Sequence, residues 1–545
     1  MKRAVLRAFF MLVITAFMLA LATACNRGSN DGGPVAIVDG RYESPVTLTL
    51  GKVTGTTFLP GDSIGDNPLT RHIRDVLNIE IVIDWEVPDT EAYNTQLALR
   101  IAAGDIPDLI TLGTDQFLTF IQLANNDMLA DLRPGYDAHA NDRIRDILDS
   151  YGGATLTPFE RDGELLALAG GRFGWEHNKL WMRQDWLDDS GFAAPVTVED
   201  IENILIHWRD NPPGPDYVGM MLNAGDISNP MSAMSASPIF HAFGAYPAHW
   251  ITGPDGAITY GSTLPEMRYA LEVLQRWFAN GLIDQQFVIG DWGYQTALIS
   301  SGQTGTYFAP WWFPYVHGDF PHMNPGGELM AFNAPVNAAG QFSTIFPGPI
   351  GDMVMIREGH PNPEALVKMI NVIFDAWRGD DAVGYELLRE TREAGVNWVE
   401  LFPTGSFNLE VATVIRDGAI PVRDFVHHGI VPEDATVQWL ETLEAIRDFY
   451  NTRVVDGPNW VEFTARYIGM SPDLMHAVQY QYPAFYFFTE SQADFFGHLQ
   501  LLENTTFIRI VIGELPIEAF DQFVLDWYAQ GGQIWTDEVR EIVGR

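Results

Sequence analysis

The chain has 545 residues, a hydrophobic fraction of 47% and a formal net charge of −39, with 71 acidic residues against 32 basic ones. This length is sufficient for two or more hydrophobic cores. The negative charge argues against a nucleic-acid-binding protein and against attraction to anionic lipid head groups, because the surface would repel the phosphates of both partners.

The N-terminus has the composition of a secretion signal, predicted over residues 1–24. Three basic residues, Lys2, Arg3 and Arg7, precede an apolar stretch over 9–21 that is short for a bilayer span. The segment that follows, Leu21 to Cys25, resembles the lipobox of bacterial lipoproteins, which implies a lipid anchor on Cys25. The same segment also fits an ordinary A-x-A cleavage site. Cys25 is the only cysteine, so no disulfide is expected.

The next residues, 25–43, are polar and glycine-rich and are predicted to form a tether. Strand and helix patterns then alternate. The predicted strands cover 46–50, 79–85 and 108–112, and the predicted helices run from Asn67-Pro68 to Leu77 and from about Thr90 to Gly104. Strand–helix–strand–helix–strand within about 70 residues indicates a parallel sheet in an α/β unit.

The alternation continues through the rest of the chain. Further predicted elements are a strand over 180–183, a helix over 185–190 with Asp185 as its N-cap, a helix that starts at Thr197 with Asp200, a hairpin over 250–260, a helix that ends before Gly281, a helix from Asn362-Pro363 and a helix over 520–527. The apolar stripes of these helices are expected to form core packing, and no internal repeat is present.

Several stretches in this order resemble the extracellular solute-binding proteins of ABC importers, in particular the large sugar-type lipoproteins related to LipO and LplA. The matching stretches are 97–111 (LALRIAAGDIPDLIT), 180–192 (LWMRQDWLDDSGF), 241–261, 278–284 (FANGLID), 305–315 (GTYFAPWWFPY) and 501–527. The resemblance implies a two-lobed α/β fold of the type 2 periplasmic-binding-protein class, with crossing hinge segments and ligand-driven closure.

The resemblance also implies a division of the chain and a set of partners. Residues 44–170 are expected in the first lobe, 171–340 in the second, 341–455 in the first again, and 456–545 in the second lobe and the hinge. The expected partners are a small solute such as an oligosaccharide, the ABC permease and, through the lipid anchor, the membrane. A monomer on the extracellular face of the cell membrane is expected, or in the periplasm if the host has an outer membrane.

Ligand contacts are expected first from an aromatic row between Pro310 and Pro314. Two prolines in five residues disfavour a regular helix or central strand, so Trp311, Trp312 and Tyr315 are predicted on a loop. Rings on a stiff loop suit the apolar face of a pyranose. In sugar-binding relatives the tryptophan after the equivalent proline stacks on sugar, which the resemblance carries to Trp311. The alternative is that these rings close the core of a lobe.

Weaker ligand candidates lie in other loops. Trp175, Tyr246 and Trp250 are in loops rich in glycine, proline or histidine, and Asp62 and Asp115 follow predicted strands. The aspartates would accept hydrogen bonds from sugar hydroxyls, or would be solvated turn residues.

An esterase is the alternative enzymatic reading. Gly61-Asp62-Ser63-Ile64-Gly65 fits the G-x-S-x-G pattern and resembles GDSL-type esterases, and His476 stands in a D-x-x-H segment. However, the predicted helix starts four residues past Ser63, whereas a nucleophile elbow runs directly into its helix. No metal-ligand spacing is present. We therefore expect a binding protein without catalytic residues, cofactor or metal, which takes an oligosaccharide or, alternatively, a peptide or another non-sugar solute.

Overall fold

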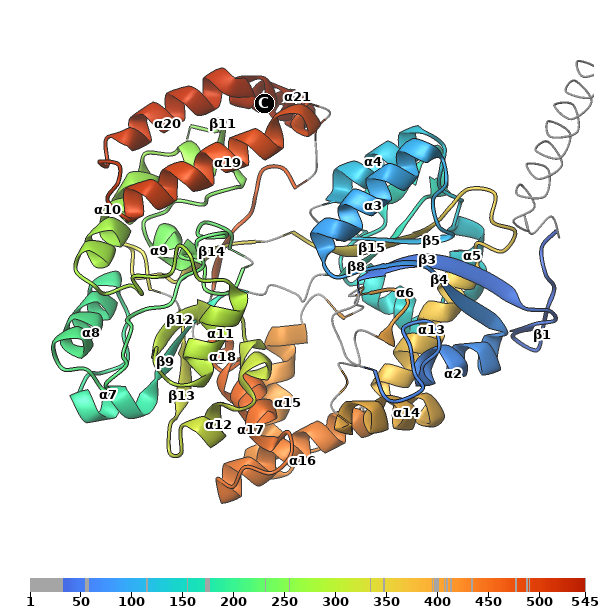
Figure 1. Cartoon of the computed structure of the whole chain (residues 1–545), viewed down its shortest axis with the longest axis horizontal. Helices are drawn as coiled ribbons and strands as arrows, with labels where there is room; N and C mark the ends of the chain where they lie inside the picture. The colour runs from blue at the N-terminus through green and yellow to red at the C-terminus, as the bar shows by residue number, and fades with distance from the viewer. Residues whose placement is uncertain are drawn as a thin grey trace, which may run out of the picture.

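The structure is a computed structural model that describes residues 33–544, except 54–57, 114–115, 154, 172–176, 231, 254, 334, 347, 395, 397–400, 406, 408–409, 412–413, 433–434, 476–477, 487–488 and 490. The chain forms two lobes that stand side by side (Figure 1). Each lobe has its own hydrophobic core. Buried residues of 42–169 and 353–407 form one cluster, and the other large clusters draw on 180–342 and 422–539. The predicted two-lobed α/β fold is confirmed.

The first lobe is built on a five-stranded mixed sheet. Its order is β4 (Ile79–Val87), β3 (Val46–Val53), β5 (Leu109–Leu112), β15 (Ile350–Ile356) and β8 (Leu168–Gly171). The first three strands are parallel, as predicted, and β15 is antiparallel to both of its neighbours. The chain therefore returns from the second lobe to complete this sheet.

Helices surround this sheet, and two small hairpins flank it. The helices are α2 (Pro68–Leu77), α3 (Thr90–Ala103), α4 (Phe117–Asn125), α5 (Arg133–His139), α6 (Asp142–Asp149), α13 (Ala365–Arg378) and α14 (Ala382–Glu393), and the hairpins pair β1 (Ile37–Val38) with β2 (Arg41–Tyr42) and β6 (Glu160–Arg161) with β7 (Glu164–Leu165). The predicted starts of α2 and α3 are confirmed. Asn67 caps α2 with a capping box, and Asp89 caps α3, which ends at Gly104 in the left-handed conformation.

The second lobe has a smaller, antiparallel sheet in the order β12 (Thr306–Ala309), β9 (Lys179–Arg183), β13 (Leu329–Phe332). Beside it lie the hairpin β10 (Trp250–Thr252) and β11 (Ile258–Tyr260) and the parallel pair β14 (Ser343–Ile345) and β16 (Gln479–Gln481). Helices supply most of its core, so the resemblance to an α/β unit is weaker here than in the first lobe.

The helices of the second lobe come from two parts of the chain. The first part contributes α7 (Gln184–Ser190), α8 (Val198–Asp210), α9 (Ser237–Ala242), α10 (Glu266–Ala279), α11 (Trp292–Ser300) and α12 (Phe320–Met323). The second part contributes α15 (Val414–His428), α16 (Val437–Thr452), α17 (Asn459–Glu462), α18 (Pro472–Met475), α19 (Gln492–Val511), α20 (Ala519–Trp527) and α21 (Gln533–Val543). None of the helices in the described part of the chain is long and apolar enough to span a membrane.

Two predicted helix starts differ from the structure. Asp185 was expected as the N-cap of α7, but the cap is Arg183, and the Asp185 carboxylate accepts a hydrogen bond from Arg183 Nε at 2.7 Å. The helix expected from Asn362-Pro363 begins at Ala365. The reason is that the Asn362 side chain pairs with the backbone of Val35, so it serves the N-terminal segment instead of a helix end.

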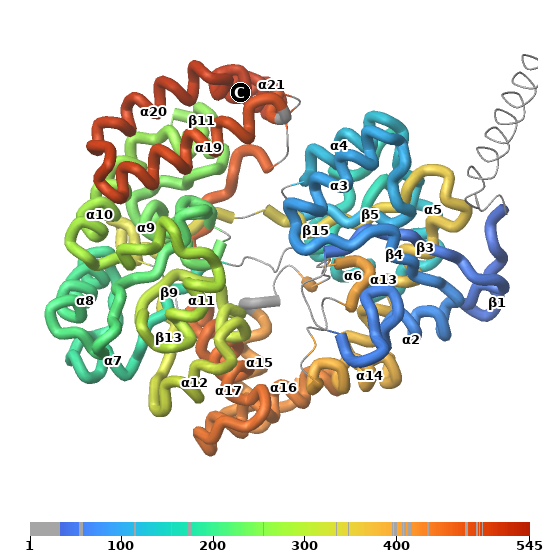
Figure 2. Tube along the Cα trace, viewed as in Figure 1, coloured from blue at the N-terminus to red at the C-terminus, as the bar shows by residue number. Residues whose placement is uncertain are grey.

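The chain crosses between the lobes three times, after β8, after β14 and after residue 407 (Figure 2). The last crossing lies earlier than the sequence suggested. Residues 414–455 were expected in the first lobe, yet Phe425 of α15 and Leu443 of α16 are buried in a cluster with Trp181 of β9. Their apolar faces match the second lobe's core, and helical periodicity alone does not reveal which core a helix joins.

Helix α16 nevertheless contacts both lobes. Near its start, the hydroxyl of Tyr385 in α14 donates a hydrogen bond to the Glu441 carboxylate. Further along, Leu443, Ile446 and Phe449 are buried in the second lobe. This helix runs along the lower edge of the molecule from α14 to α17 (Figure 1), so it braces one lobe against the other.

Candidate functional site

The predicted proline loop is present and follows β12 directly. Pro310 leads into a turn at Trp311 and Trp312, and a short 3₁₀ segment, Phe313–His317, contains Pro314. The rings of this loop divide into two groups. Trp311 is only 6% exposed and Phe313 is fully buried, whereas Trp312 is partly exposed and Tyr315 is 40% exposed.

Trp311 packs against a cation. The guanidinium of Arg466 lies 5.2 Å from the ring centroid of Trp311 and 5.2 Å from that of Trp439, which comes from α16. Glu462 fixes this arrangement, because its Oε2 accepts hydrogen bonds from Arg466 Nε at 3.0 Å and from the Tyr315 hydroxyl at 2.6 Å. Burial lowers the pKa of Arg466, but Tyr315 and Glu462 raise it by more, so the guanidinium stays charged.

This cluster also lies near the third crossing segment. Burial raises the pKa of Glu410, and the charges that oppose this effect are those of Arg378 and, after it, Arg466 and Arg143. Glu410 accepts a hydrogen bond from Arg378 Nη1 of α13 at 3.2 Å. Glu410, which lies in the third crossing segment, is therefore bonded to the first lobe and is within range of the charge of Arg466.

Trp250 and Tyr246 make the contacts of core residues. Trp250 is 4% exposed, and its ring centroid lies 5.1 Å from those of both Tyr260 and Trp535. Tyr246 is 9% exposed, and its hydroxyl bonds Ser343 Oγ at 2.6 Å. A ligand would have to displace this packing to reach either ring, so in this conformation both fit the core alternative.

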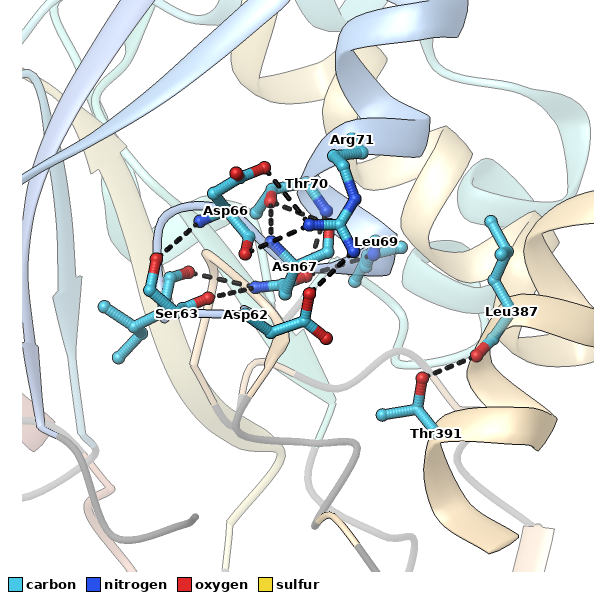
Figure 3. A network of polar contacts seen from close by, with 10 residues as sticks. Asp62, Ser63, Asp66, Asn67, Leu69, Thr70, Arg71, Leu387 and Thr391 are labelled. Atoms are coloured by element: carbon cyan, nitrogen blue, oxygen red, sulfur yellow. Dashed lines mark hydrogen bonds and ion pairs between the residues drawn. The ribbon is translucent and has the colours of Figure 1, made fainter. Parts of the chain in front are cut away.

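Asp62 and Ser63 are held in the turn before α2 (Figure 3). The Asp62 carboxylate pairs with Arg71 Nη2 at 2.8 Å, and its side chain is 12% exposed. Ser63 Oγ accepts a hydrogen bond from the backbone N–H of Asp66 at 3.1 Å. Both side chains therefore stabilise the local turn, and Ser63 is not on a strand-to-helix elbow.

The remaining predicted residues Cys25, Asp115, Trp175 and His476 lie outside the described residues. The described residues around His476 nevertheless bear on the esterase reading. Asp473, of the same D-x-x-H segment, is in α18 of the second lobe and pairs with Lys179 Nζ at 3.0 Å, whereas Ser63 is in the first lobe. Among the described residues, no group of three or more His, Cys, Asp or Glu side chains is arranged to hold a metal ion.

A second aromatic group was not singled out from the sequence. Phe346, Tyr480, Tyr482 and Tyr486 gather where the chain leaves β14 for the first lobe. The alternation in 479–486 (QYQYPAFY) is the signal that could have indicated it, since every second residue of a strand shares a face. Arg466, Trp439 and Glu462 were also missed, because nothing in their local sequence points to the proline loop.

Comparison with known proteins supports the fold and the resemblance. No protein-family model matches the chain. Two curated relatives match at low identity: the polygalacturonan/rhamnogalacturonan-binding protein YtcQ of Bacillus subtilis, 22% identical over 44% of this chain and 45% of its own length, and the fructooligosaccharide ABC transporter substrate-binding protein FusA of Streptococcus pneumoniae, 20% identical over 54% and 56%. The chain thus spans about half the length of the curated relatives it matches.

Among solved structures, an extracellular solute-binding protein from Bifidobacterium longum subsp. infantis superimposes with a TM-score of 0.63, over 93% of this chain and 99% of that one, at 14% identity. This similarity establishes the fold across both lobes. Both curated relatives are named for a saccharide that they bind, in agreement with the resemblance found in the sequence motifs.

Proposed function

We propose that this chain, which has the two-lobed fold of extracellular solute-binding proteins, captures an oligosaccharide between its lobes and delivers it to an ABC permease. The observation that carries the proposal is the arrangement of two separate cores joined by three chain crossings. Two separately packed lobes that are joined by crossing segments and a bracing helix can close around a ligand by hinge motion. The saccharide class is supported by what the two curated relatives are named for.

We place ligand contacts on the proline loop. Trp312 and Tyr315 offer accessible ring surface for the apolar face of a sugar, and the ring centroid of Trp311 lies 6.4 Å from that of Tyr315. Trp175 and Asp115 remain candidate contacts from the sequence. Asp62, Tyr246 and Trp250 already have protein partners in the structure, so we do not include them in the contact set.

Secretion and lipid attachment through Cys25 complete the proposal. An anchored binding protein stays near the permease it serves, and a diacylglycerol group supplies two acyl chains, which suffice for stable anchoring. A Cys25→Ser variant is expected to move from the membrane fraction to the medium or periplasm. An unchanged membrane association would argue against the lipid anchor.

The ligand class is tested by a thermal-shift screen of the purified protein against oligosaccharides, peptides and small metabolites. A ligand that binds only the folded state raises the melting temperature. We expect a saccharide to produce this shift and Trp312→Ala to reduce it, while Trp377→Ala, at a partly buried tryptophan in α13 of the first lobe, leaves it in place. Shifts with peptides and none with saccharides would overturn the saccharide class.

We further propose that the protein releases its ligand unchanged. Hydrolysis of a p-nitrophenyl ester should be no faster with the wild-type protein than with the Ser63→Ala variant. Turnover that disappears in that variant would favour the esterase instead.

A further inference from the structure

The parallel pair β14–β16 lies where the chain leaves the second lobe. Phe346 directly follows β14, and its N–H donates a hydrogen bond to the Gln481 carbonyl at the end of β16 at 2.8 Å. A few residues later the chain enters β15 in the first lobe. The segment after β16 therefore starts at the second crossing, and Figure 1 shows it between the lobes, below α19.

Four aromatic rings from these two segments form one surface, which we call the tyrosine platform: Phe346, Tyr480, Tyr482 and Tyr486. The Phe346 centroid lies 5.2 Å from that of Tyr482, 6.0 Å from that of Tyr486 and 6.2 Å from that of Tyr480. Tyr482 is 54% exposed and the other three rings are partly exposed. Core aromatics in this lobe, such as Trp250, are almost fully covered, so the platform leaves ring surface open to a ligand.

The platform touches the crossing segment itself. A Cβ atom placed on Gly348, whose φ is +89°, would lie 3.4 Å from a ring carbon of Tyr486. Gly348 lies between β14 and β15, so Tyr486 packs on the backbone that joins the lobes. A ligand on this platform is therefore adjacent to a hinge segment.

A buried ion pair lies next to His177, whose ring is a neighbour of the platform. The ring of His177, just past the first crossing, lies 4.9 Å from Phe342 and 6.5 Å from Tyr480. His177 adjoins Lys179, which is fully buried and whose Nζ lies 3.0 Å from Asp473 Oδ2. Because breaking one partner of a buried pair is costly, the pair fixes the position of His177, whose ring is a neighbour of Tyr480.

The charge around the platform favours an uncharged ligand. The pKa of Tyr486 is raised to about 12 by burial and, after it, by Tyr482, so a negative charge is disfavoured on this surface. The chain as a whole carries a net charge of −39. A carboxylate placed here would lose hydration and add to the negative charge of the protein.

From these observations we infer that the tyrosine platform binds one pyranose or furanose ring of a neutral oligosaccharide and disfavours uronic acids. The inference rests on the proposed function and narrows its ligand class. Aromatic rings accommodate the C–H face of a neutral sugar, while the phenol hydroxyls of the platform offer hydrogen bonds to its hydroxyls. A uronic acid has the same C–H face but also carries a negative charge, which this surface disfavours.

The test measures affinities of the purified protein for a panel of neutral oligosaccharides and for oligogalacturonate by titration calorimetry. Tyr482→Ala is expected to weaken the best neutral ligand about tenfold, the size of a lost stacking contact. Tyr482→Phe keeps the ring and should retain most of the affinity. Tyr269→Ala is the matched control, because Tyr269 is 57% exposed on α10 in the same lobe. Since both tyrosines are exposed, all variants should melt near the wild-type temperature.

The outcomes distinguish a failure of the platform from a failure of the proposed function. If a neutral saccharide binds and Tyr482→Ala binds it as tightly as the wild-type protein, the platform is not a ligand site, while the proposed function stands. If oligogalacturonate binds more tightly than every neutral sugar, the preference for neutral ligands is overturned. If no saccharide binds any variant, both the platform and the proposed function are overturned.

Discussion

The guanidinium of Arg466 lies 5.2 Å from the ring centroid of Trp311, the residue that sequence motifs single out as the first ligand contact. A tryptophan that is 6% exposed and covered by a cation already has a packing role. Its neighbour Trp312 is partly exposed. We therefore expect Trp311 to contribute mainly to the stability of the protein and Trp312 mainly to ligand binding.

The first prediction concerns this difference between the two tryptophans. Trp311→Ala is expected to lower the free energy of unfolding by about 3–5 kcal/mol, because it opens a cavity and removes the ring beneath Arg466. Trp312→Ala should cost about 1 kcal/mol, since a partly exposed ring gives up less buried surface. Urea unfolding of the two variants measures both values. Equal losses would show that the two rings are buried alike in solution.

A second prediction concerns the turn before α2. The side chain of Asn67 is fully buried, accepts from the backbone N–H groups of Leu69 and Thr70, and donates to the carbonyl oxygens of Ser63 and Ile64. Asn67→Ala should cost about 2 kcal/mol, because it removes the helix cap and leaves buried carbonyls without their donor.

Ser63→Ala is the comparison in the same turn. It removes only the acceptor of the Asp66 N–H, which is exposed, so the expected loss is below about 1 kcal/mol. Chemical denaturation of both variants measures these values. A larger loss for Ser63→Ala than for Asn67→Ala would contradict this account of the turn.

Such local features were the part of the fold that could be predicted best. The cap at Asn67, the capping box of Thr197 with Asp200 and the terminal glycines 104, 191 and 281 all depend on residues within a few positions of one another. The Asn362 side chain forms hydrogen bonds with the backbone of Val35, which is far away in sequence. A prediction from neighbouring residues alone therefore misplaces the start of that helix. The two-lobed plan came from ordered family motifs, not from periodicity.

The site was less predictable because it is assembled from distant segments. The proline loop meets Arg466 and Trp439 only in the folded chain, more than a hundred residues away in sequence. Trp250 was predicted from its glycine- and proline-rich surroundings, but Trp535 at the far end of the chain covers it. The composition of a loop does not indicate whether a helix that is remote in sequence will bury its side chains.

A third prediction concerns the brace between the lobes. Tyr385→Phe removes the hydroxyl that donates to Glu441 near the start of α16. A hydrogen bond to a charged group contributes about 1.5–3 kcal/mol, so amide hydrogen exchange in the first turns of α16 should accelerate at least about tenfold. Exchange near Ile446 and Phe449, which are buried in the second lobe, should stay unchanged.

Tyr450→Phe provides the matched control for the brace. Tyr450 is in the same helix but packs its ring on Tyr467 and Phe463 of the second lobe. Its loss of a hydroxyl should leave the start of α16 as protected as in the wild-type protein. Acceleration along the whole helix in Tyr385→Phe would instead mean that α16 opens as one unit.

The last prediction concerns pH and the buried carboxyl of Glu503 in α19. This residue is 4% exposed, and burial raises its pKa to about 7, although hydrogen bonds from Ser262, Ser228 and Tyr260 oppose the shift. Because the folded-state pKa exceeds the unfolded one, the folded protein retains a proton that the unfolded chain releases between about pH 4.5 and pH 7.

The protonated form of Glu503 therefore stabilises the fold, and this contribution is complete below about pH 4.5 and is lost as the pH rises to about 7. With a folded-state pKa of about 7, the loss amounts to roughly 3 kcal/mol. Glu503→Gln keeps the shape and stays neutral, so its free energy of unfolding should decline less steeply over this range, and the variant should be the more stable protein at pH 8. Urea unfolding at intervals of half a pH unit measures both curves. If the two proteins lose stability in parallel, Glu503 is already ionised in the folded state and another group carries the pH dependence.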